Sequence, residues 1–340
     1  MLHLLAGTNL GHALVVNVST VGAQERKRSM KAFYSDVFVL PLPEGHRFPM
    51  QKYRLLREQI VAEGIIPARN LIVPKPATDE QLALVHDTDY IRKVKTGQLS
   101  EKEIRRMGFP WSPELVERSR RSVGGTISAC RAALEDGISA NLAGGTHHAF
   151  PDFGAGFCVF NDVAVAARVM LAEERVRRVV VIDCDVHQGD GTAAIFADDE
   201  RVFTFSVHGA RNFPFRKQHS DLDIALDDNT GDNDYLAALK TGAYYAIELA
   251  GADLAIYLAG ADPYSGNTLG RLAISKTGLA ERDRFVFRTC YEKKLPVTVV
   301  MSGGYARKLQ NTVEIHAETI RTAAHFDRKS ESRVWGDATL

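Results

Sequence analysis

The chain has 340 residues, of which 45% are hydrophobic and 25% charged, as in ordinary globular proteins. Its 42 basic and 42 acidic residues give a formal net charge of zero, which argues against nucleic acid as a direct partner. The sequence has no uninterrupted apolar run of 18 residues, so we expect no membrane-spanning helix. The four cysteines lack CxxC spacing, which favours free thiols in a reducing compartment and predicts a cytoplasmic protein.

The two ends of the chain differ from its middle. Residues 1–29 lack the cationic start of a signal peptide, because the basic cluster at 26–28 follows the apolar part and does not precede it. We therefore expect residues 1–29 to be an extension outside the fold. Residues 30–328 show no break in composition and predict one domain, and residues 329–340 are polar and predict a loose tail.

Apolar runs alternate with helical patterns across this domain. The predicted strands are residues 32–40, 141–143, 178–183, 202–207, 254–258 and 297–301. The predicted helices are residues 49–62, 113–136, 162–174, 233–250, 280–293 and 311–324, with helical turns within 79–94. Continuously apolar strands separated by helices predict an α/β fold, with a single open parallel β-sheet and helices on both faces.

Glycine-rich and polar segments follow five of the predicted strands. They are residues 144–148 (GGTHH), 183–191 (DCDVHQGDG), 206–209 (SVHG), 259–262 (AGAD) and 302–305 (SGGY). Open α/β sheets place their sites beyond the carboxyl ends of the strands. We therefore expect these five segments to meet at one edge of the sheet and to form a single site.

The second of these segments has the spacing of a metal site. Asp185 and His187 are two residues apart, so on extended backbone their side chains would point the same way. Asp262 follows another buried strand and is the best third ligand. Two aspartates and one histidine suit Zn²⁺ or Fe²⁺ and leave coordination positions open for water and substrate.

Two adjacent histidines predict proton transfer beside this metal. His147 and His148 follow a Gly-Gly turn, and we expect each ring to be oriented by a carboxylate. Asp183 and Asp190 are unassigned carboxylates in the right part of the chain. Tyr305 also follows two glycines, and its phenol could donate a hydrogen bond to a developing oxyanion, although such a tyrosine more often serves packing.

Three loop residues could shape the approach to this site. Phe157 and Phe213 lie in Gly- and Pro-rich loops and could wall a narrow channel, although a loop aromatic usually only covers core. Residues 44–50, which include His46, could reach the mouth of the pocket.

With these motifs the chain resembles the zinc-dependent histone deacetylase family, most closely its class IV branch and the bacterial deacetylase-like proteins. The resemblance runs from about Met30 to the last predicted helix, with the motifs in the family's order. The segments that carry it are residues 144–148 (GGTHH), 156–162 (GFCVFND), 183–191 (DCDVHQGDG), 260–262 (GAD) and 302–305 (SGGY).

The resemblance implies the arginase/histone deacetylase fold and metal-dependent amide hydrolysis. It implies that Zn²⁺ binds to Asp185, His187 and Asp262, and that His148, paired with Asp190, is the general base. His147, paired with Asp183, would be its electrostatic partner, and Tyr305 would polarise the acyl carbonyl. Phe157 and Phe213 would flank the tunnel for the acylated side chain. We also expect Gly156 and His46 to be substrate-binding residues, although the segment that contains His46 departs from the family's pattern. A structural K⁺ site would use Asp183, Asp185, His187 and Ser206.

The expected reaction removes an acyl group, most simply acetyl, from a lysine side chain of a protein or peptide, or from a similar primary amine. One alternative is the deacylation of acetylpolyamines or other small amides, which Arg211 and Arg216 disfavour because they would repel a polycation. A two-manganese ureohydrolase would need a second carboxylate beside Asp262, where Pro263 and Tyr264 follow instead. A catalytically silent binding module would lack a ligand, the base or the tyrosine, and all are present.

Overall fold

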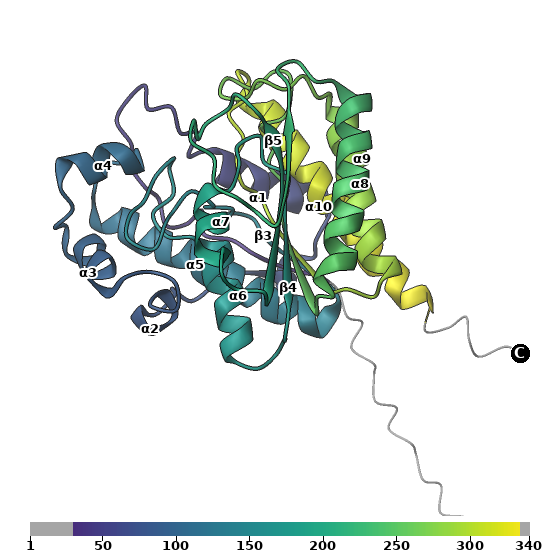
Figure 1. Cartoon of the computed structure of the whole chain (residues 1–340), viewed down its shortest axis with the longest axis horizontal. Coiled ribbons are helices and arrows are strands. Elements are labelled where there is room, and N and C mark those ends of the chain that lie inside the picture. The colour runs from purple at the N-terminus through teal and green to yellow at the C-terminus, as the bar shows by residue number, and fades with distance from the viewer. Residues whose placement is uncertain (1–29, 334–340) are drawn as a thin grey trace, which may run out of the picture.

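The computed structural model describes residues 30–333. The predicted extension at 1–29 and the end of the predicted tail, residues 334–340, lie outside the described residues. All paired strands within 30–333 run parallel in one sheet, with the order β2-β1-β3-β8-β7-β4-β5-β6. Figure 1 shows this sheet in the middle of the molecule, with helices to its left and right. The strands are β1 (Lys31–Phe33), β2 (Leu71–Ile72), β3 (Ile138–Asn141), β4 (Val179–Asp183), β5 (Val202–Gly209), β6 (Leu222–Leu226), β7 (Leu254–Leu258) and β8 (Val297–Val300).

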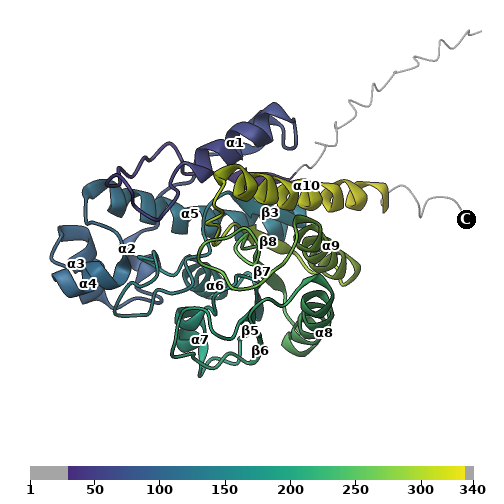
Figure 2. The same ribbon diagram turned by 90° about the horizontal axis from the view of Figure 1, so that it is seen from above.

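Helices connect most of these strands and cover both faces of the sheet. Figure 2 shows α8, α9 and α10 on one side of the strands and α5, α6 and α7 on the other. The helices are α1 (Lys52–Ala62), α2 (Asp79–Leu82), α3 (Thr88–Thr96), α4 (Glu101–Met107), α5 (Pro113–Asp136), α6 (Asp162–Ala172), α7 (Asp190–Phe196), α8 (Asp232–Ala250), α9 (Lys276–Glu292) and α10 (Leu309–Arg333). The predicted fold class, an open parallel α/β sheet covered on both faces, is confirmed.

Alternating side chains of the central strands explain why the sheet is apolar on both faces. In β4, Val180 and Ile182 belong to the hydrophobic cluster under α8–α10, whereas Val179 and Val181 belong to the cluster under α5 and α6. Successive side chains of a strand point to opposite faces, so a central strand buried on both sides must be apolar throughout. This is the physical origin of the unbroken apolar runs in the sequence.

Several element boundaries differ from the predictions. β1 ends at Phe33, whereas the predicted strand ran to residue 40, because the chain leaves the sheet for a long loop toward α1. β3 begins at Ile138, directly after Gly137 ends α5 with a positive φ of 93°, so the strand lies before the predicted 141–143. β2, β6, α4 and α7 were not predicted. α10 continues to Arg333, past the start of the predicted tail at 329.

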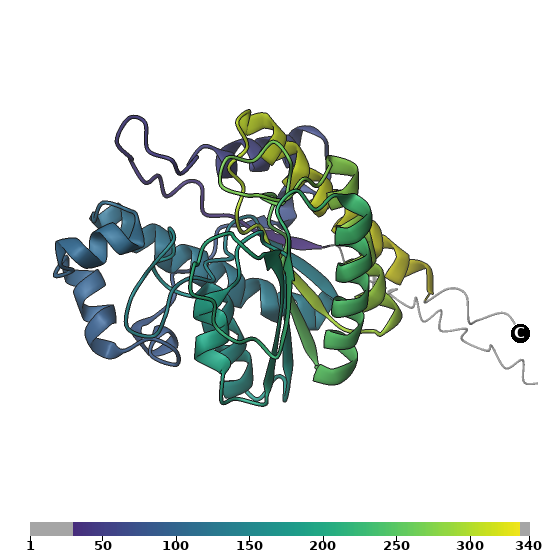
Figure 3. The same ribbon diagram turned by 45° about the horizontal axis from the view of Figure 1, so that its top comes forward.

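The carboxyl ends of the strands lie at one edge of the sheet, and a site can form there. Figure 3 shows the long loop before α1 and the group α2–α4 on the same side of the sheet. The loops that follow β3, β8, β7 and β4 are neighbours there, because these four strands are adjacent in the sheet. None of the helices within residues 30–333 combines the length and apolarity that a bilayer crossing requires.

Candidate active site

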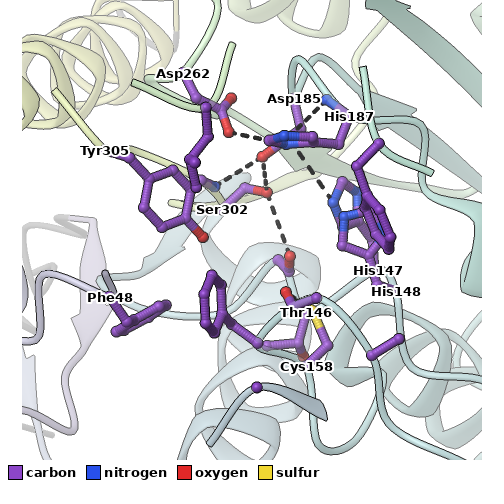
Figure 4. A pocket seen from close by; sticks show the side chains of 18 of the residues that line it. Phe48, Thr146, His147, His148, Cys158, Asp185, His187, Asp262, Ser302 and Tyr305 are labelled. Atoms are coloured by element: carbon purple, nitrogen blue, oxygen red, sulfur yellow. Dashed lines mark hydrogen bonds and ion pairs between the residues drawn. The ribbon is translucent and has the colours of Figure 1, made fainter. Parts of the chain in front are cut away.

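The loops after the four central strands bring the predicted site residues together. Figure 4 shows Asp185, His187 and Asp262 at the top of a pocket, with Tyr305 on one side and the two adjacent histidines on the other. The pocket is a cavity of about 700 Å³, and residues from all four loops line it. Four of the five predicted segments therefore meet here as loops. The fifth, at 206–209, belongs to β5 itself and is not a loop.

The three predicted metal ligands form one buried cluster. One ligand atom from each of Asp185, His187 and Asp262 lies within 4.8 Å of the others. His187 Nδ1 lies 2.9 Å from Asp185 Oδ1 and 3.3 Å from Asp262 Oδ2. The sequence argument assumed extended backbone between the first two residues, but they occupy a bend beyond β4. The bend itself turns both side chains toward Asp262.

The hydrogen bonds of this cluster fit a divalent metal ion. Asp262 Oδ1 accepts a bond from the Val186 N–H at 3.0 Å, but Asp262 Oδ2, although buried, accepts none among the described residues. Asp185 Oδ2 accepts bonds from the Ser302 hydroxyl at 2.7 Å and the Gly303 N–H at 2.8 Å. Buried oxygens that are oriented by such partners while one oxygen stays free are typical of a metal site.

Gly303 forms the floor of the cluster. A Cβ atom at this position would lie 1.9 Å from Asp262 Oδ2 and 2.7 Å from Asp185 Oδ2. No side chain could be accommodated there without moving both carboxylates. The close approach of this backbone is what allows the Gly303 N–H to donate directly to Asp185.

Each of the adjacent histidines is paired with the predicted carboxylate. His147 Nδ1 lies 2.6 Å from Asp183 Oδ2, and His148 Nδ1 lies 2.6 Å from Asp190 Oδ1. The two ring centroids are 4.2 Å apart. A carboxylate at Nδ1 fixes the ring and favours a proton on that nitrogen, so Nε2 is left for chemistry in the cavity.

The two histidines differ in their electrostatic surroundings. Burial opposes a charged ring at both positions, but the nearby carboxylates of Asp183 and Asp185 raise the pKa of His147 to about 9. Burial and the charge of His147 lower the pKa of His148 to about 4. These surroundings favour the protonated form of His147 and the neutral form of His148, and a neutral imidazole is the form that can accept a proton.

A buried carboxylate holds the Gly-Gly-Thr turn that carries both histidines. Asp162 accepts hydrogen bonds from the Gly145 N–H at 3.1 Å, the Thr146 N–H at 2.7 Å and the Thr146 hydroxyl at 2.6 Å. The Thr126 hydroxyl of α5 is a further donor to it, at 2.5 Å. Sequence reasoning did not assign Asp162, and its place in the 156–162 motif was the available signal.

Aromatic side chains form the walls of the cavity. Phe213 lies 4.9 Å from His148, measured between ring centroids, and Phe157 lies 6.1 Å from Tyr305. Gly156 has a positive φ of 54°, and a Cβ there would lie 2.6 Å from His148 Cδ2. These three predicted substrate-binding residues therefore lie at the cavity, where Gly156 keeps the space beside the histidine open.

His46 lies behind this wall. Its Nε2 lies 3.0 Å from the Gly108 carbonyl oxygen, and its ring is 5.7 Å from Phe109 and 5.8 Å from Phe157. The adjacent residues Arg47 and Phe48 line the cavity, whereas His46 is not part of its lining. The histidine thus supports Phe157 from outside.

Tyr305 is held by its backbone as well as by its ring. Its N–H donates to Asn267 Oδ1 at 2.8 Å, and its carbonyl accepts from the Thr268 N–H at 3.0 Å. Burial raises the pKa of the Tyr305 phenol, so the group stays protonated and can act as a hydrogen-bond donor. Lys52 Nζ lies 5.3 Å from the centroid of the tyrosine ring.

Two of the predicted K⁺ ligands lie on neighbouring strands. Asp183 at the end of β4 is the register partner of Ser206 in β5. The Ser206 hydroxyl lies 3.0 Å from His208 Nδ1, and both residues are buried. The K⁺ ligands among Asp183, Asp185, His187 and Ser206 stay a prediction.

Comparison with known proteins decides the family. A sequence model described as the histone deacetylase domain matches residues 46–320. The chain belongs to the histone deacetylase family. A histone deacetylase-family relative from Arabidopsis thaliana, histone deacetylase 2, is 30% identical over 292 residues, which cover 82% of this chain and 76% of that protein. An uncharacterized protein of Picosynechococcus sp. is 44% identical over 290 residues, which cover 85% of this chain and 97% of the relative.

Solved structures show the same fold for this histone deacetylase-family chain. The crystal structure of a histone deacetylase homologue from Aquifex aeolicus superimposes with a TM-score of 0.75 at 23% identity, covering 87% of this chain and 84% of that one. The HD domain of HDA15 also gives a TM-score of 0.75, at 20% identity, covering 91% and 93%. The arginase/histone deacetylase fold that the sequence resemblance implied is thus confirmed.

Proposed function

We propose that this protein is a zinc-dependent amidohydrolase that removes an acyl group from a lysine side chain or a similar primary amine. The observation that carries this proposal is the position of two His–Asp pairs and a tyrosine around one metal-ligand cluster in a single cavity. Nucleophile activation, proton transfer and stabilisation of an oxyanion are the three tasks of amide hydrolysis, and these groups are suited to them.

The metal would be held by Asp185, His187 and Asp262. A bound Zn²⁺ ion supplies Lewis-acid polarisation and a lowered pKa for water at the site. His148, oriented by Asp190 at Nδ1, accepts the proton of the attacking water at Nε2 and later returns a proton to the leaving amine.

Tyr305 faces the histidine pair from across the cavity (Figure 4). Its phenol donates a hydrogen bond to the acyl oxygen as negative charge develops there, a contribution of about 3 kcal/mol by comparison with other oxyanion donors. His147, paired with Asp183, contributes positive charge beside the reacting group. Each role is independent of the acyl group's length.

The walls suit a side chain with a long apolar stem. Phe157 and Phe213 flank the approach, so methylene groups of an acylated lysine would pack between them while the amide reaches the catalytic groups. Arg211 and Arg271, both paired with Asp228, make the rim basic. A basic rim disfavours acetylpolyamines, because they are polycations. All four cysteines are buried and free, which supports a location in the cytoplasm.

The proposal is tested with zinc-loaded protein and acetyl-lysine, longer acyl-lysine and acetylpolyamine substrates, with and without a hydroxamate chelator. We expect chelator-sensitive hydrolysis of an acyl-lysine substrate. Tyr305→Phe should lower kcat at least about 100-fold, the usual loss for one oxyanion donor, while zinc stoichiometry stays unchanged. Tyr245→Phe, on the exposed surface of α8, is the matched control. Near-wild-type turnover by Tyr305→Phe would refute the role of the phenol.

A further inference from the structure

Exposed arginines from four separate segments gather at the mouth of the cavity. The predicted metal ligands are buried, so the exposed residues of the lining mark the end of the cavity that opens to solvent. The segments are the loop before α1, the end of α4, the loop after β5 and the loop after β7. The exposed cations of the lining are Arg47, Arg105, Arg106, Arg211 and Arg271.

Few carboxylates oppose these charges. Within residues 30–333, the acidic side chains of the cavity lining are the two aspartates of the predicted metal cluster, at its buried end. Arg105 pairs with Glu101, whose side chain is 90% exposed. The guanidinium of Arg106 lies over the ring of Phe153, 4.3 Å from its centroid. Neither Arg106 nor Arg47 forms an ion pair with a residue in the described part of the chain.

A buried asparagine brings two of these arginines together. Asn212 is 3% exposed, and its side chain donates to the Leu269 carbonyl at 2.8 Å and accepts from the Arg271 N–H at 3.3 Å. The guanidinium groups of Arg211 and Arg271 lie 3.7 Å and 3.2 Å from the same oxygen of Asp228. One carboxylate cannot neutralise two guanidinium groups, so positive charge remains on this side of the mouth.

The arginines flank both aromatic walls of the approach. Arg211 lies two residues before Phe213. On the other side, the Phe157 N–H donates to the carbonyl of Met107, the residue that follows Arg106, at 2.8 Å. A side chain that enters between the two phenylalanines would therefore belong to a molecule that meets positive charge on either side of the entrance.

The position of this charge restricts the kind of partner. The whole chain has a formal net charge of zero, so the positive mouth is a local feature, which disfavours nucleic acid. The mouth also leads to the predicted catalytic groups, so an anion bound there has to carry a group that enters the cavity. A peptide with an acylated lysine meets both conditions if acidic residues lie beside that lysine.

We propose that the mouth of the cavity is a docking surface for acidic peptide segments, with aspartate or glutamate beside the acylated lysine. A guanidinium presents parallel N–H groups that match a carboxylate, which an ammonium does not. The same charges repel segments rich in lysine. This inference names a substrate class and rests on the proposed amidohydrolase function.

The expected effect is moderate, because water and salt screen exposed ion pairs. One flanking carboxylate should improve binding about threefold, and two should improve it about tenfold. Charges at a rim act mainly on the encounter with the substrate and change the chemical step little. The preference should therefore appear in KM and kcat/KM, with similar kcat.

The first measurement compares three peptides that differ only in the two residues beside a central acetyl-lysine, which are aspartate, asparagine or lysine. We expect kcat/KM of the zinc-loaded protein to be about tenfold higher for the aspartate peptide than for the asparagine peptide. The lysine peptide should give the lowest value. The aspartate preference should fall below about twofold in 1 M NaCl, where screening acts within about 3 Å.

Two double variants test the two sides of the mouth. They are Arg211→Gln with Arg271→Gln, and Arg105→Gln with Arg106→Gln. We expect each to lower the ratio of kcat/KM between the aspartate and asparagine peptides at least about threefold. The ratio compares two neutral-to-acidic substrates within one variant, so a general loss of activity does not affect it.

The control removes the same charge from the opposite edge of the sheet. Arg177 and Arg201 are exposed and lie directly before β4 and β5, whereas the cavity lies beyond the carboxyl ends of the strands. Arg177→Gln with Arg201→Gln should keep the full aspartate preference. An equal loss in the control would show that only net charge matters and would overturn the docking surface.

The second measurement does not depend on activity. Fluorescence anisotropy gives the affinity of metal-depleted protein for the three labelled peptides, and we expect the order aspartate, asparagine, lysine. The double variants of the mouth should lose this order and the control should keep it. A labelled oligonucleotide is measured alongside, and tighter binding of the oligonucleotide than of the aspartate peptide, lost in the same variants, would overturn the peptide in favour of nucleic acid.

The two measurements separate this inference from the proposed function. Hydrolysis of all three peptides at similar kcat/KM, with equal affinities, overturns the docking surface and leaves the amidohydrolase intact. If the zinc-loaded protein hydrolyses none of them, the proposed function fails, and the affinities alone decide the docking surface. An aspartate preference that the variants of the mouth lose and the control keeps, in either measurement, supports it.

Discussion

Replacing Gly303 by alanine tests whether its backbone sets the geometry of the predicted metal ligands Asp185 and Asp262. The added Cβ would lie 1.9 Å from Asp262 Oδ2, a separation that real Cβ atoms essentially never show. To reach even 3.0 Å, the carboxylate would have to retreat by about 1 Å, whereas zinc sites tolerate deviations of only about 0.2 Å in ligand distance. The same methyl group would also press on Asp185 Oδ2, at 2.7 Å.

We expect Gly303→Ala to weaken zinc binding at least about 100-fold, the upper range for loss of a partner that orients ligands, which corresponds to about 2.7 kcal/mol. The assay is a competition titration of metal-depleted protein with zinc and a chelator of known affinity. Gly231→Ala is the control, because a Cβ there has no atom within 4 Å. Wild-type zinc affinity in Gly303→Ala would show that the cluster is not set by this close approach.

Two further predictions concern groups that support the site from behind. Asp162→Asn should lower the free energy of unfolding in urea by about 3 kcal/mol, because an amide offers its NH₂ group to donors that now bind a buried carboxylate. Exposed Asp198→Asn should change little, and equal stability of the two variants would contradict the assignment. Burial lowers the pKa of His86 to about 4 from 6.5. Its Nδ1 lies 3.0 Å from the Phe150 carbonyl oxygen and its Nε2 accepts the Asn161 N–H at 2.9 Å, so the folded protein holds it neutral. Its contribution is therefore complete above pH 6.5 and is lost as the pH falls toward 4, by about 3 kcal/mol in all. Urea midpoints of wild type and His86→Gln should converge over this range, and parallel pH profiles would contradict the interpretation.

The central strands could be predicted from the sequence because a strand that is buried on both faces is apolar at every position. Leu254–Leu258 is buried on both faces and apolar at every position, and the predicted strand coincides with β7. β6 (Leu222–Leu226) was missed because it lies at the edge of the sheet, where burial alternates and polar residues interrupt the apolar pattern. Its pairing depends on β5, a partner that local sequence cannot reveal.

The same distinction applies to the site. The sequence was enough to predict that the loops after parallel strands meet at one edge of the sheet. Asp185, His187 and Asp262 lie in such loops, and the structure places them in one cluster. The contacts that support them were not predictable, because they join segments distant in the chain. Gly303 reaches Asp185 across 118 positions, and Arg118 meets the ring of Tyr53 from another helix.

The strand order also has a consequence for how the protein is made. β8 (Val297–Val300) is the last strand along the described residues, yet it lies in the middle of the sheet, between β3 and β7. Until it inserts, the growing chain carries two half-sheets with unpaired inner edges, and such edges invite pairing with other chains. The loop after β8 also supplies Ser302 and Gly303, the donors to Asp185. The donors that orient Asp185 are therefore absent until nearly the whole domain has been synthesised.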